Sequence, residues 1–181
     1  TNKEKLVFNI SNEKPIDFIL KLKWRVRRND TTIIASGDET VEVKALSAIN
    51  CLHLTSRKTK LTPDMYKNHY IEYKLVQGSA LISSGTYMYV LPKQFEYLNP
   101  GITCRVIQIG DIYKFSFNSE NFAKSVYIDF DEFDCVFSDN WFDIHGTEIS
   151  VIVPRMSLPL YSTSDNLKEK IKIKSYYDLY T

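Results

Sequence analysis

The chain has 181 residues, of which 44% are hydrophobic and 25% charged, a composition typical of one large or two small globular domains that bury a core. Its formal net charge of +1 gives no overall electrostatic support to nucleic-acid binding, and no apolar run is long enough to span a membrane. The cysteines have no Cys-x-x-Cys spacing, which argues against a structural zinc site. We expect small buried thiols at Cys51, Cys104 and Cys135, although Cys104 and Cys135 could pair if their strands face each other.

The first half of the chain alternates apolar and polar residues in the manner of β-strands. In residues 18–28, the apolar side chains from Phe18 to Val26 fall on one face, and four cations from Lys21 to Arg27 fall on the other. This pattern predicts a strand with one wet face, and we interpret the cations as its solvated side. Further strands are expected at 4–10, 31–36, 38–44, 48–55, 69–77 and 80–90, with turns at 29–30 and 36–38.

A domain boundary is expected at Leu91-Pro92, because proline cannot donate to a strand ladder and favours an extended link. The alternation resumes beyond this point, most clearly at 111–118, where aromatic residues alternate with polar ones. A second small sandwich is therefore expected. Its other strands are expected at 93–98, 103–109, 124–130, 133–137 and 147–153.

The end of the chain has a different pattern. Ser164 opens a segment with capping residues, and Leu167 and Ile171 lie one helical turn apart, which predicts a short helix. The whole pattern predicts an all-β chain of two tandem antiparallel β-sandwiches, at 1–91 and 92–160, followed by a short helical or extended tail at 161–181.

The sequence contains no catalytic or cofactor-binding motif that we recognise. A nucleophile elbow, a phosphate loop and a dinucleotide fingerprint are all absent. The histidines His53, His69 and His145 do not have a spacing that would hold one metal ion. The acidic residues from Asp129 onward lack the glycine and glutamate positions of a calcium-binding loop. We therefore predict no catalytic residue, no metal and no cofactor.

Residues 137–153 predict a strand end, a tight polar turn and a further strand. Asp139, Asn140 and Asp143 have side-chain oxygens that can hydrogen-bond nearby backbone amides, so we interpret them as residues that stabilise the turn. We interpret Trp141 as a staple that holds the turn to the sheet or to a neighbouring domain; the functional alternative is a face for sugar stacking. If the turn binds a ligand, the candidate binding residues are Trp141, Asn140, Asp139 and Asp143.

The run Phe137-Ser-Asp-Asn-Trp-Phe-Asp143 resembles the last immunoglobulin-like domain of the β-mannosidases of glycoside hydrolase family 2. In that family a Phe-Ser-Asp-Asn-aromatic-Phe-Asp run precedes a Gly-Glu-type turn and an apolar strand. One departure is His145, which precedes Gly146 where the family usually has proline. The other segments that resemble the family are Leu6–Lys14, the strand around Trp24 and Val41–Ser47 in the first half, and Leu91–Lys93 and Asn121–Tyr127 in the second.

The resemblance implies that both halves are immunoglobulin-like β-sandwiches, and that the chain is the non-catalytic C-terminal module pair of a β-mannosidase. Such a parent is a retaining enzyme that hydrolyses terminal β-D-mannose residues of glycans and manno-oligosaccharides. Its catalytic glutamates lie in a barrel that no segment of this chain resembles. The implied partners are the catalytic barrel and the N-terminal domains of the same parent chain, and carbohydrate is a candidate ligand.

Two further expectations concern the origin of the chain and its compartment. Because the chain opens on Thr1 instead of a methionine, we expect an excised fragment of a longer protein. A periplasmic or a secreted, lysosomal-type parent fits the family.

Two other functions agree with the same residues. An autonomous binding module would hold carbohydrate on a sandwich face or loop rim, with Trp141, Tyr87, Tyr89 and Tyr97 as candidate contacts. A structural or adhesion sandwich would need no ligand.

Overall fold

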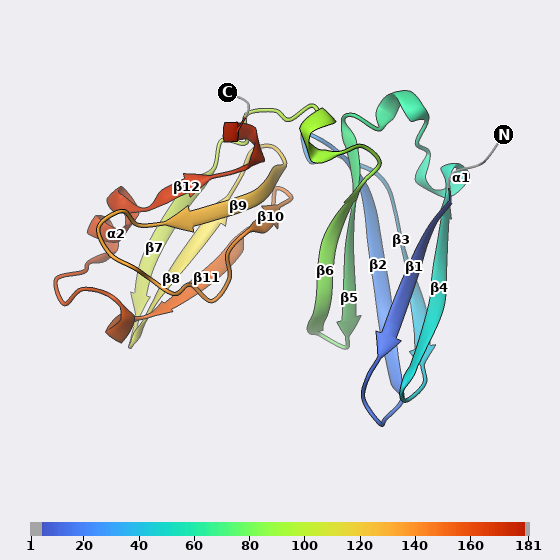
Figure 1. Ribbon diagram of the computed structural model, residues 1–181, viewed down its shortest axis with the longest axis horizontal. Coiled ribbons are helices and arrows are strands. Elements are labelled where there is room, and N and C mark those ends of the chain that lie inside the picture. The colour runs from blue at the N-terminus through green and yellow to red at the C-terminus, as the bar shows by residue number, and fades with distance from the viewer. Residues whose placement is uncertain (1–4, 180–181) are drawn as a thin grey trace. The chain divides into compact units, whose positions relative to one another are not determined.

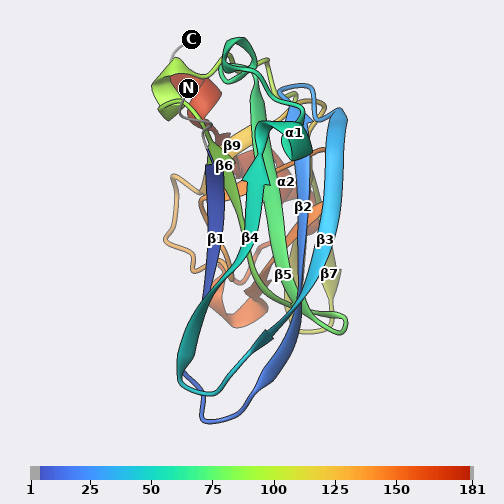
Figure 2. The ribbon, with the colours of Figure 1, turned by 90° about the vertical axis from the view of Figure 1, so that its right-hand side faces the viewer.

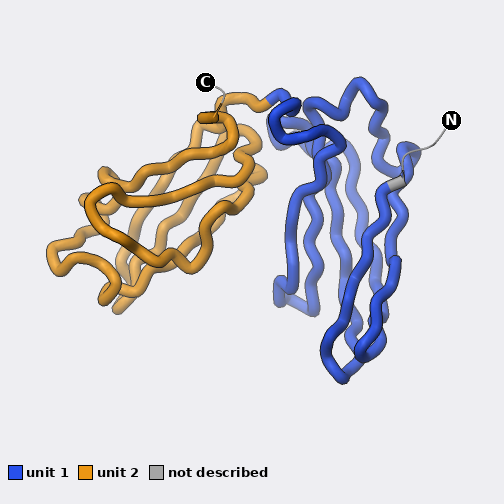
Figure 3. The backbone as a smooth tube through the Cα atoms, viewed as in Figure 1, with its two compact units in different colours: residues 1–96 blue, residues 97–181 orange. Residues whose placement is uncertain are grey.

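Antiparallel strands make up most of the regular structure in the computed structural model, which describes residues 5–179 (Figure 1). The chain divides into two compact units, residues 1–96 and 97–181 (Figure 3). Each unit stacks two sheets around a core of its own, so the predicted all-β pair of sandwiches with a short C-terminal helix is confirmed. The units divide beyond Leu91-Pro92, because the Phe95 ring packs against the Tyr70 ring of the first unit, with 6.3 Å between their centroids.

The first unit stacks a four-stranded sheet, in the order β3-β2-β5-β6, against the antiparallel pair β1-β4. In Figure 2 the pair β1-β4 runs in front of the larger sheet. The elements are β1 (Lys5–Asn12), β2 (Phe18–Arg28), β3 (Ile33–Val43), β4 (Ser47–Thr55), the short helix α1 (Ser56–Thr59), β5 (His69–Gln77) and β6 (Ala80–Met88), with 3-10 turns η1 (Pro63–Met65) and η2 (Pro92–Gln94).

Strand β3 continues through Gly37, so the predicted turn at 36–38 is wrong. Gly37 is the register partner of Trp24 on β2, and the indole lies directly over it. A Cβ atom at position 37 would lie 2.8 Å from the Cζ2 atom of Trp24. The glycine is therefore needed for close packing of a large aromatic side chain, which is a known use of glycine inside a strand.

The cationic face of β2 is wet only in part. Lys21 and Arg25 are half-exposed, but the Arg27 side chain is buried and its Nε donates to Oε2 of the buried Glu72 at 2.7 Å. The Arg27 Nη1 donates to the carbonyl of Thr31 at 2.8 Å. The prediction of a fully solvated face is wrong at Arg27, because the neighbouring strand β5 supplies a carboxylate that β2 alone could not reveal.

The second unit stacks the sheet β11-β8-β7 against the sheet β10-β9-β12. Tyr113, Phe115 and Phe117 from β8 are fully buried in its core. The elements are β7 (Thr103–Ile109), β8 (Ile112–Asn118), β9 (Ala123–Asp129), β10 (Phe142–Ile144), β11 (Ile149–Pro154), helix α2 (Ser164–Lys170) and β12 (Lys172–Lys174), with 3-10 turns η3 (Arg155–Ser157) and η4 (Tyr176–Leu179).

The residues predicted as a tail are built into this second sandwich. Helix α2 is present where predicted, its N-cap is Thr163, and Leu167 is buried in the core. Strand β12 pairs with β9, so Ile173 lies opposite Ile128. Residues 161–179 therefore pack as part of the second sandwich, which the sequence pattern did not predict.

Two predicted strands are absent from the described residues. Residues 92–94 form the turn η2, because Pro92 lacks an N–H donor and favours a helical start. Residues 133–137 have no ladder partner, although Phe133, Cys135 and Phe137 do pack against the core. The alternation of apolar and polar residues therefore predicted which side chains of this segment are buried, but it did not predict that the backbone lacks strand pairing.

The three cysteines are unpaired and only partly buried. Burial raises the pKa of the Cys104 thiol to about 11 and that of the Cys135 thiol to about 11. Both groups are therefore protonated at neutral pH, as is usual for cysteines that serve as small apolar side chains.

Candidate functional site

The turn at 138–144 contains all four residues predicted from the sequence, and Asn140 holds it to strand β9. The Asn140 Oδ1 accepts from the backbone N of Ile128 at 2.9 Å, and its Nδ2 donates to the carbonyl of Ile128 at 2.8 Å. The same Oδ1 accepts from the backbone N of Trp141 at 3.0 Å. Asn140 thus pairs with β9 as a strand residue would, and it stabilises the turn.

The two carboxylates of the turn also bind backbone groups. The Asp143 side chain accepts from the backbone N of Ser125 at 2.8 Å and from the Lys124 Nζ at 2.9 Å. Ser125 has a φ of 50°, so this contact stabilises a left-handed kink in β9. Asp139 is exposed, and its Oδ1 accepts from the backbone N of Asn140 at 2.8 Å. Asp143 and Asn140 are therefore tied into the fold by several bonds.

Trp141 and Phe142 have opposite environments. Phe142 points into the core, where its ring centroid lies 5.4 Å from that of Phe117. Trp141 remains 64% exposed, and its ring centroid lies 4.8 Å from that of Tyr127. Phe142 anchors the turn, whereas Trp141 lies over a neighbouring ring on the outer face of β9.

The other aromatic residues proposed as sugar contacts belong to different clusters. In the first unit, the Tyr89 ring stacks on Tyr66 at 4.2 Å and meets Tyr87 edge-on at 5.0 Å. In the second unit, Tyr97 lies 6.3 Å from the ring of Phe122. The structure instead brings Trp141 together with Tyr127, a residue not among the predicted sugar contacts. Its place between the buried Val126 and Ile128 on β9 was the available signal.

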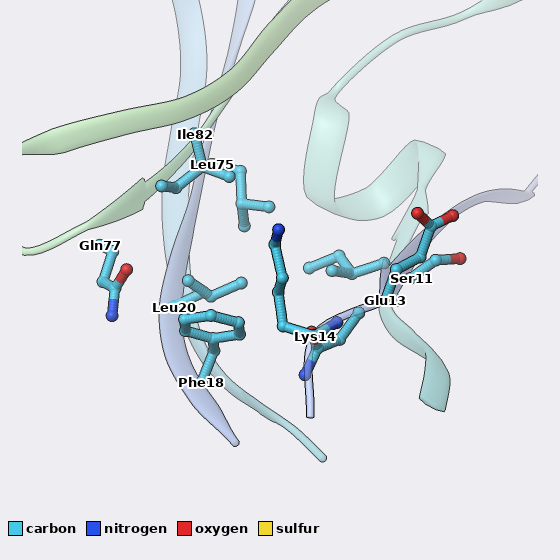
Figure 4. Close-up of a pocket in the computed structure, with 10 residues that line it drawn as sticks. Ser11, Glu13, Lys14, Phe18, Leu20, Leu75, Gln77 and Ile82 are labelled. Atoms are coloured by element: carbon cyan, nitrogen blue, oxygen red, sulfur yellow. The ribbon is translucent and has the colours of Figure 1, made fainter. Parts of the chain in front are cut away.

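A pocket of about 360 Å³ opens at one end of the first unit, lined by residues of β1, β2, β5 and β6. Figure 4 shows the Lys14 side chain extending between Phe18, Leu20 and Leu75. Asn12 orders the loop that carries Lys14, since its Nδ2 donates to the carbonyl of Ile16 at 2.8 Å and its Oδ1 accepts from the Lys14 backbone N at 2.9 Å. The lining is mostly apolar, and the carboxylate of Glu13 accompanies the ammonium of Lys14, so the pocket offers few groups for the many hydroxyls of a sugar.

A second hollow, of about 500 Å³, lies beside an apolar loop in the second unit, lined by Asp111 and residues of the segment 154–160. Met156 is 92% exposed and Leu160 is 95% exposed, while Leu158 between them is buried. The buried leucine fixes the loop, and the two flanking side chains project into solvent. No sequence pattern identified this surface.

Among residues 5–179, no cluster of three or more His, Cys, Asp and Glu side chains could hold a metal ion. In the same part of the chain, no helix has the length and apolar character needed to cross a membrane.

The family models match both halves of the chain. The model described as "Mannosidase Ig/CBM-like domain" matches residues 4–94, and that described as "Ig-fold domain", of the mannosidases, matches residues 97–179. The chain belongs to the mannosidase Ig/CBM-like domain family. The recognition of immunoglobulin-like mannosidase domains in the sequence is therefore confirmed, and so is the immunoglobulin-like character of the fold.

Solved structures match this mannosidase Ig/CBM-like chain over almost its whole length. The β-D-mannosidase of Dictyoglomus thermophilum matches with a TM-score of 0.75 and 16% identity, over 97% of this chain and 21% of that chain. The exo-chitosanase CsxA of Amycolatopsis orientalis matches with a TM-score of 0.55 and 13% identity, over 94% of this chain and 24% of that chain. The chain thus spans about a quarter or less of these proteins, and at such identities the likeness concerns the fold. No curated protein matches the chain.

Proposed function

We propose that the chain is the non-catalytic C-terminal domain pair of a family 2 β-mannosidase, and that it packs against the catalytic barrel of the same longer chain. The solved glycosidases that share its fold are several times longer than the part that matches. The parent would hydrolyse terminal β-D-mannose residues with retention of configuration, and the chemistry would lie outside this chain.

The electrostatics of the described carboxylates support a structural role. A glycosidase acid needs a raised pKa and a second carboxyl across the sugar. Within residues 5–179, three carboxyls have a lowered pKa because each accepts a hydrogen bond from a neighbouring side chain. The pairs are Asp17 with Lys44, Asp30 with Arg28, and Asp129 with the Tyr127 hydroxyl. Asp143 and Glu72 form ion pairs with Lys124 and Arg27. The lowered pKa values keep Asp17, Asp30 and Asp129 ionised at neutral pH, and all five carboxylates accept hydrogen bonds from nearby donors.

The observation that carries the docking proposal is the apolar loop at 154–161. Met156 and Leu160 expose almost their whole side chains, and Tyr161 is also exposed. A cluster of exposed apolar side chains that a buried residue holds in place is typical of an interaction surface. The proposed occupant is the catalytic barrel of the longer chain, since covalent linkage keeps it at a high effective concentration.

The test uses the product of the complete reading frame from which this chain derives. Met156→Ser with Leu160→Ser is expected to lower the melting temperature of the longer protein while leaving that of the 181-residue chain unchanged. Val136→Ser is the matched control, because Val136 is 80% exposed in the same unit. Equal melting temperatures for the loop variant and the unmodified longer protein would exclude docking through this loop.

A second measurement tests the assignment itself. The 181-residue chain is expected to release no product from an aryl β-mannoside, and the upstream reading frame is expected to encode a barrel of about 250 residues. Turnover by this chain alone would overturn the proposal. The second candidate function, carbohydrate binding, is favoured by the exposed Trp141 ring and is developed below.

A further inference from the structure

We propose that Trp141 and Tyr127 form an aromatic platform on the outer face of strand β9, and that it stacks a pyranose ring of a neutral β-linked oligosaccharide. This assigns a sugar contact to the accessory domains themselves, which goes beyond the proposed scaffold role. The proposal concerns this chain alone and does not depend on the presence of a barrel.

Strand alternation places the platform on the outer face. Val126 and Ile128 point into the core and are almost fully buried, so Tyr127 between them points outward. Phe142 fills the core from the neighbouring strand β10, and Trp141 before it points away. The two rings lie 4.8 Å apart at an interplanar angle of 35°. Strands β9 and β10 are neighbours in the sheet (Figure 1), so Tyr127 on β9 and Trp141 just before β10 form one aromatic pair.

The position of Trp141 is held at a conformational cost. Its φ of 66° lies in the left-handed region, which a bulky residue rarely adopts. Such a conformation persists only where the surroundings impose it, and it is common at functional sites. Here Asn140 imposes it through its bonds to Ile128 and to the Trp141 backbone N. The backbone that carries the indole is therefore fixed before a ligand arrives, which reduces the entropy lost on binding.

The groups around the platform are polar. The Tyr127 hydroxyl donates to Oδ2 of Asp129 at 2.6 Å, and Lys174 on β12 is the cross-strand partner of Tyr127. The Lys124–Asp143 ion pair joins β9 to β10. Two aromatic faces bordered by carboxylate and ammonium groups match a ring with an apolar face and a rim of hydroxyls. The apolar loop at 154–161 has the opposite character, so we assign protein contact to that loop and sugar contact to the platform.

Intrinsic fluorescence tests the proposal directly, because the chain has only two tryptophans. Trp24 is buried in the first unit, whereas Trp141 is exposed, so a ligand on the platform alters mainly the Trp141 emission. Titration with β-1,4-linked mannohexaose is expected to give a saturable change in emission. Absence of a saturable change with mannohexaose and also with chitohexaose, at millimolar concentrations, would overturn the proposal.

Two variants separate binding from folding. Trp141→Gly removes the ring but suits the positive φ, so the fold is expected to survive, and calorimetry is expected to show at least about a tenfold loss of affinity for mannohexaose. Ile109→Ala removes another exposed apolar side chain of the same unit and is expected to bind normally. Equal affinity of Trp141→Gly and the unmodified chain would contradict the proposal.

Protein docking at the platform is the competing outcome. It would appear as a lowered melting temperature of the longer protein with Trp141→Gly, together with no sugar affinity in the unmodified 181-residue chain. That result would replace the sugar assignment. Failure of the docking test at Met156 and Leu160 would leave the sugar titration unaffected, so the two proposals fail separately.

Discussion

At the scale of single residues, glycines and aromatic rings explain a difference between the predicted and observed strands. Gly37 lies under the indole of Trp24, and Gly85 lies under the phenol of Tyr73, each as a cross-strand partner. From the sequence, Gly37 between Ser36 and Asp38 indicates a turn. In the sheet the same glycine provides the space that the neighbouring ring occupies.

Gly37→Ala is expected to destabilise the first unit by about 1–3 kcal/mol, the usual cost of forcing an extra methyl group into a packed site. The new Cβ would lie 2.8 Å from Trp24, well inside normal contact distance. Urea unfolding followed by circular dichroism measures the change. The matched control is Ser36→Ala on the exposed face of the same strand, and an equally small change in both variants would contradict this packing account.

His69 makes the stability of the first unit depend on pH. The ring is buried, and burial is the main cause that lowers its pKa below the ordinary value of about 6.5. Its Nδ1 lies 2.6 Å from the Asn68 Oδ1 and 3.1 Å from the carbonyl of Met65. The Met65 carbonyl and Asp30 raise the pKa and Arg28 lowers it, and the net direction is the one set by burial. The unfolded chain therefore binds a proton at a higher pH than the folded chain does.

The contribution of His69 to stability is full above the unfolded pKa and is lost as the pH falls through the folded pKa. We expect the urea concentration at the unfolding midpoint of the first unit to decrease as the pH is lowered from about 7.5 to about 5.5. This range extends about one pH unit to each side of the ordinary histidine pKa. His69→Gln should flatten this dependence. If the pH dependence of the urea midpoint is unchanged in His69→Gln, other titrating groups cause it.

At the scale of elements, strand pairing brings together charges that lie far apart in the sequence. Arg27 on β2 and Glu72 on β5 form a buried ion pair, and Lys74 lies 3.1 Å from the same carboxylate. Hydrogen bonds fix the geometry of the Arg27–Glu72 pair. Because both side chains are buried, removal of one partner leaves the other charge buried and unpaired. The exposed pair Lys21–Asp38 on the same sheet lacks this burial.

Glu72→Leu is expected to destabilise the first unit by about 3–5 kcal/mol, because Arg27 would keep its charge in a buried site. The double variant Arg27→Met with Glu72→Leu should recover most of this loss, since neither charge then remains. Asp38→Ala at the exposed pair should change stability by less than about 1 kcal/mol. A double variant no more stable than Glu72→Leu would refute the pairing argument, and chemical denaturation measures all three.

At the scale of the whole molecule, each unit has a separate hydrophobic core. The first core is built around Leu22, Trp24 and Val26, and the second around Tyr113, Phe115 and Phe117. The second also includes Leu167 from helix α2, so its packing extends into the end of the described chain. A sandwich with its own core meets the usual condition for folding as a unit.

Cleavage of the chain between Glu96 and Tyr97 is therefore expected to yield two folded pieces. The circular dichroism spectra of residues 1–96 and 97–181, made separately, should sum to that of the intact chain. Truncation after Tyr161 is expected to unfold the second piece, because it removes Leu167 and the β12 partner of β9. An unchanged melting temperature of the truncated piece would show that the residues after Tyr161 form a tail that does not stabilise the second unit.

The sequence by itself determined the fold class and most strands, because alternation along β2 or β8 reports the two sides of a sheet. It also selected the 138–144 turn, where Asn140 accepts from the next backbone amide, whereas the bonds of Asp143 to Ser125 and Lys124 join the turn to a distant part of the sequence. Only the tertiary structure decided the partners across strands. Gly37 with Trp24, Arg27 with Glu72 and Trp141 with Tyr127 depend on strand register, and register is set by the packing of the whole sandwich.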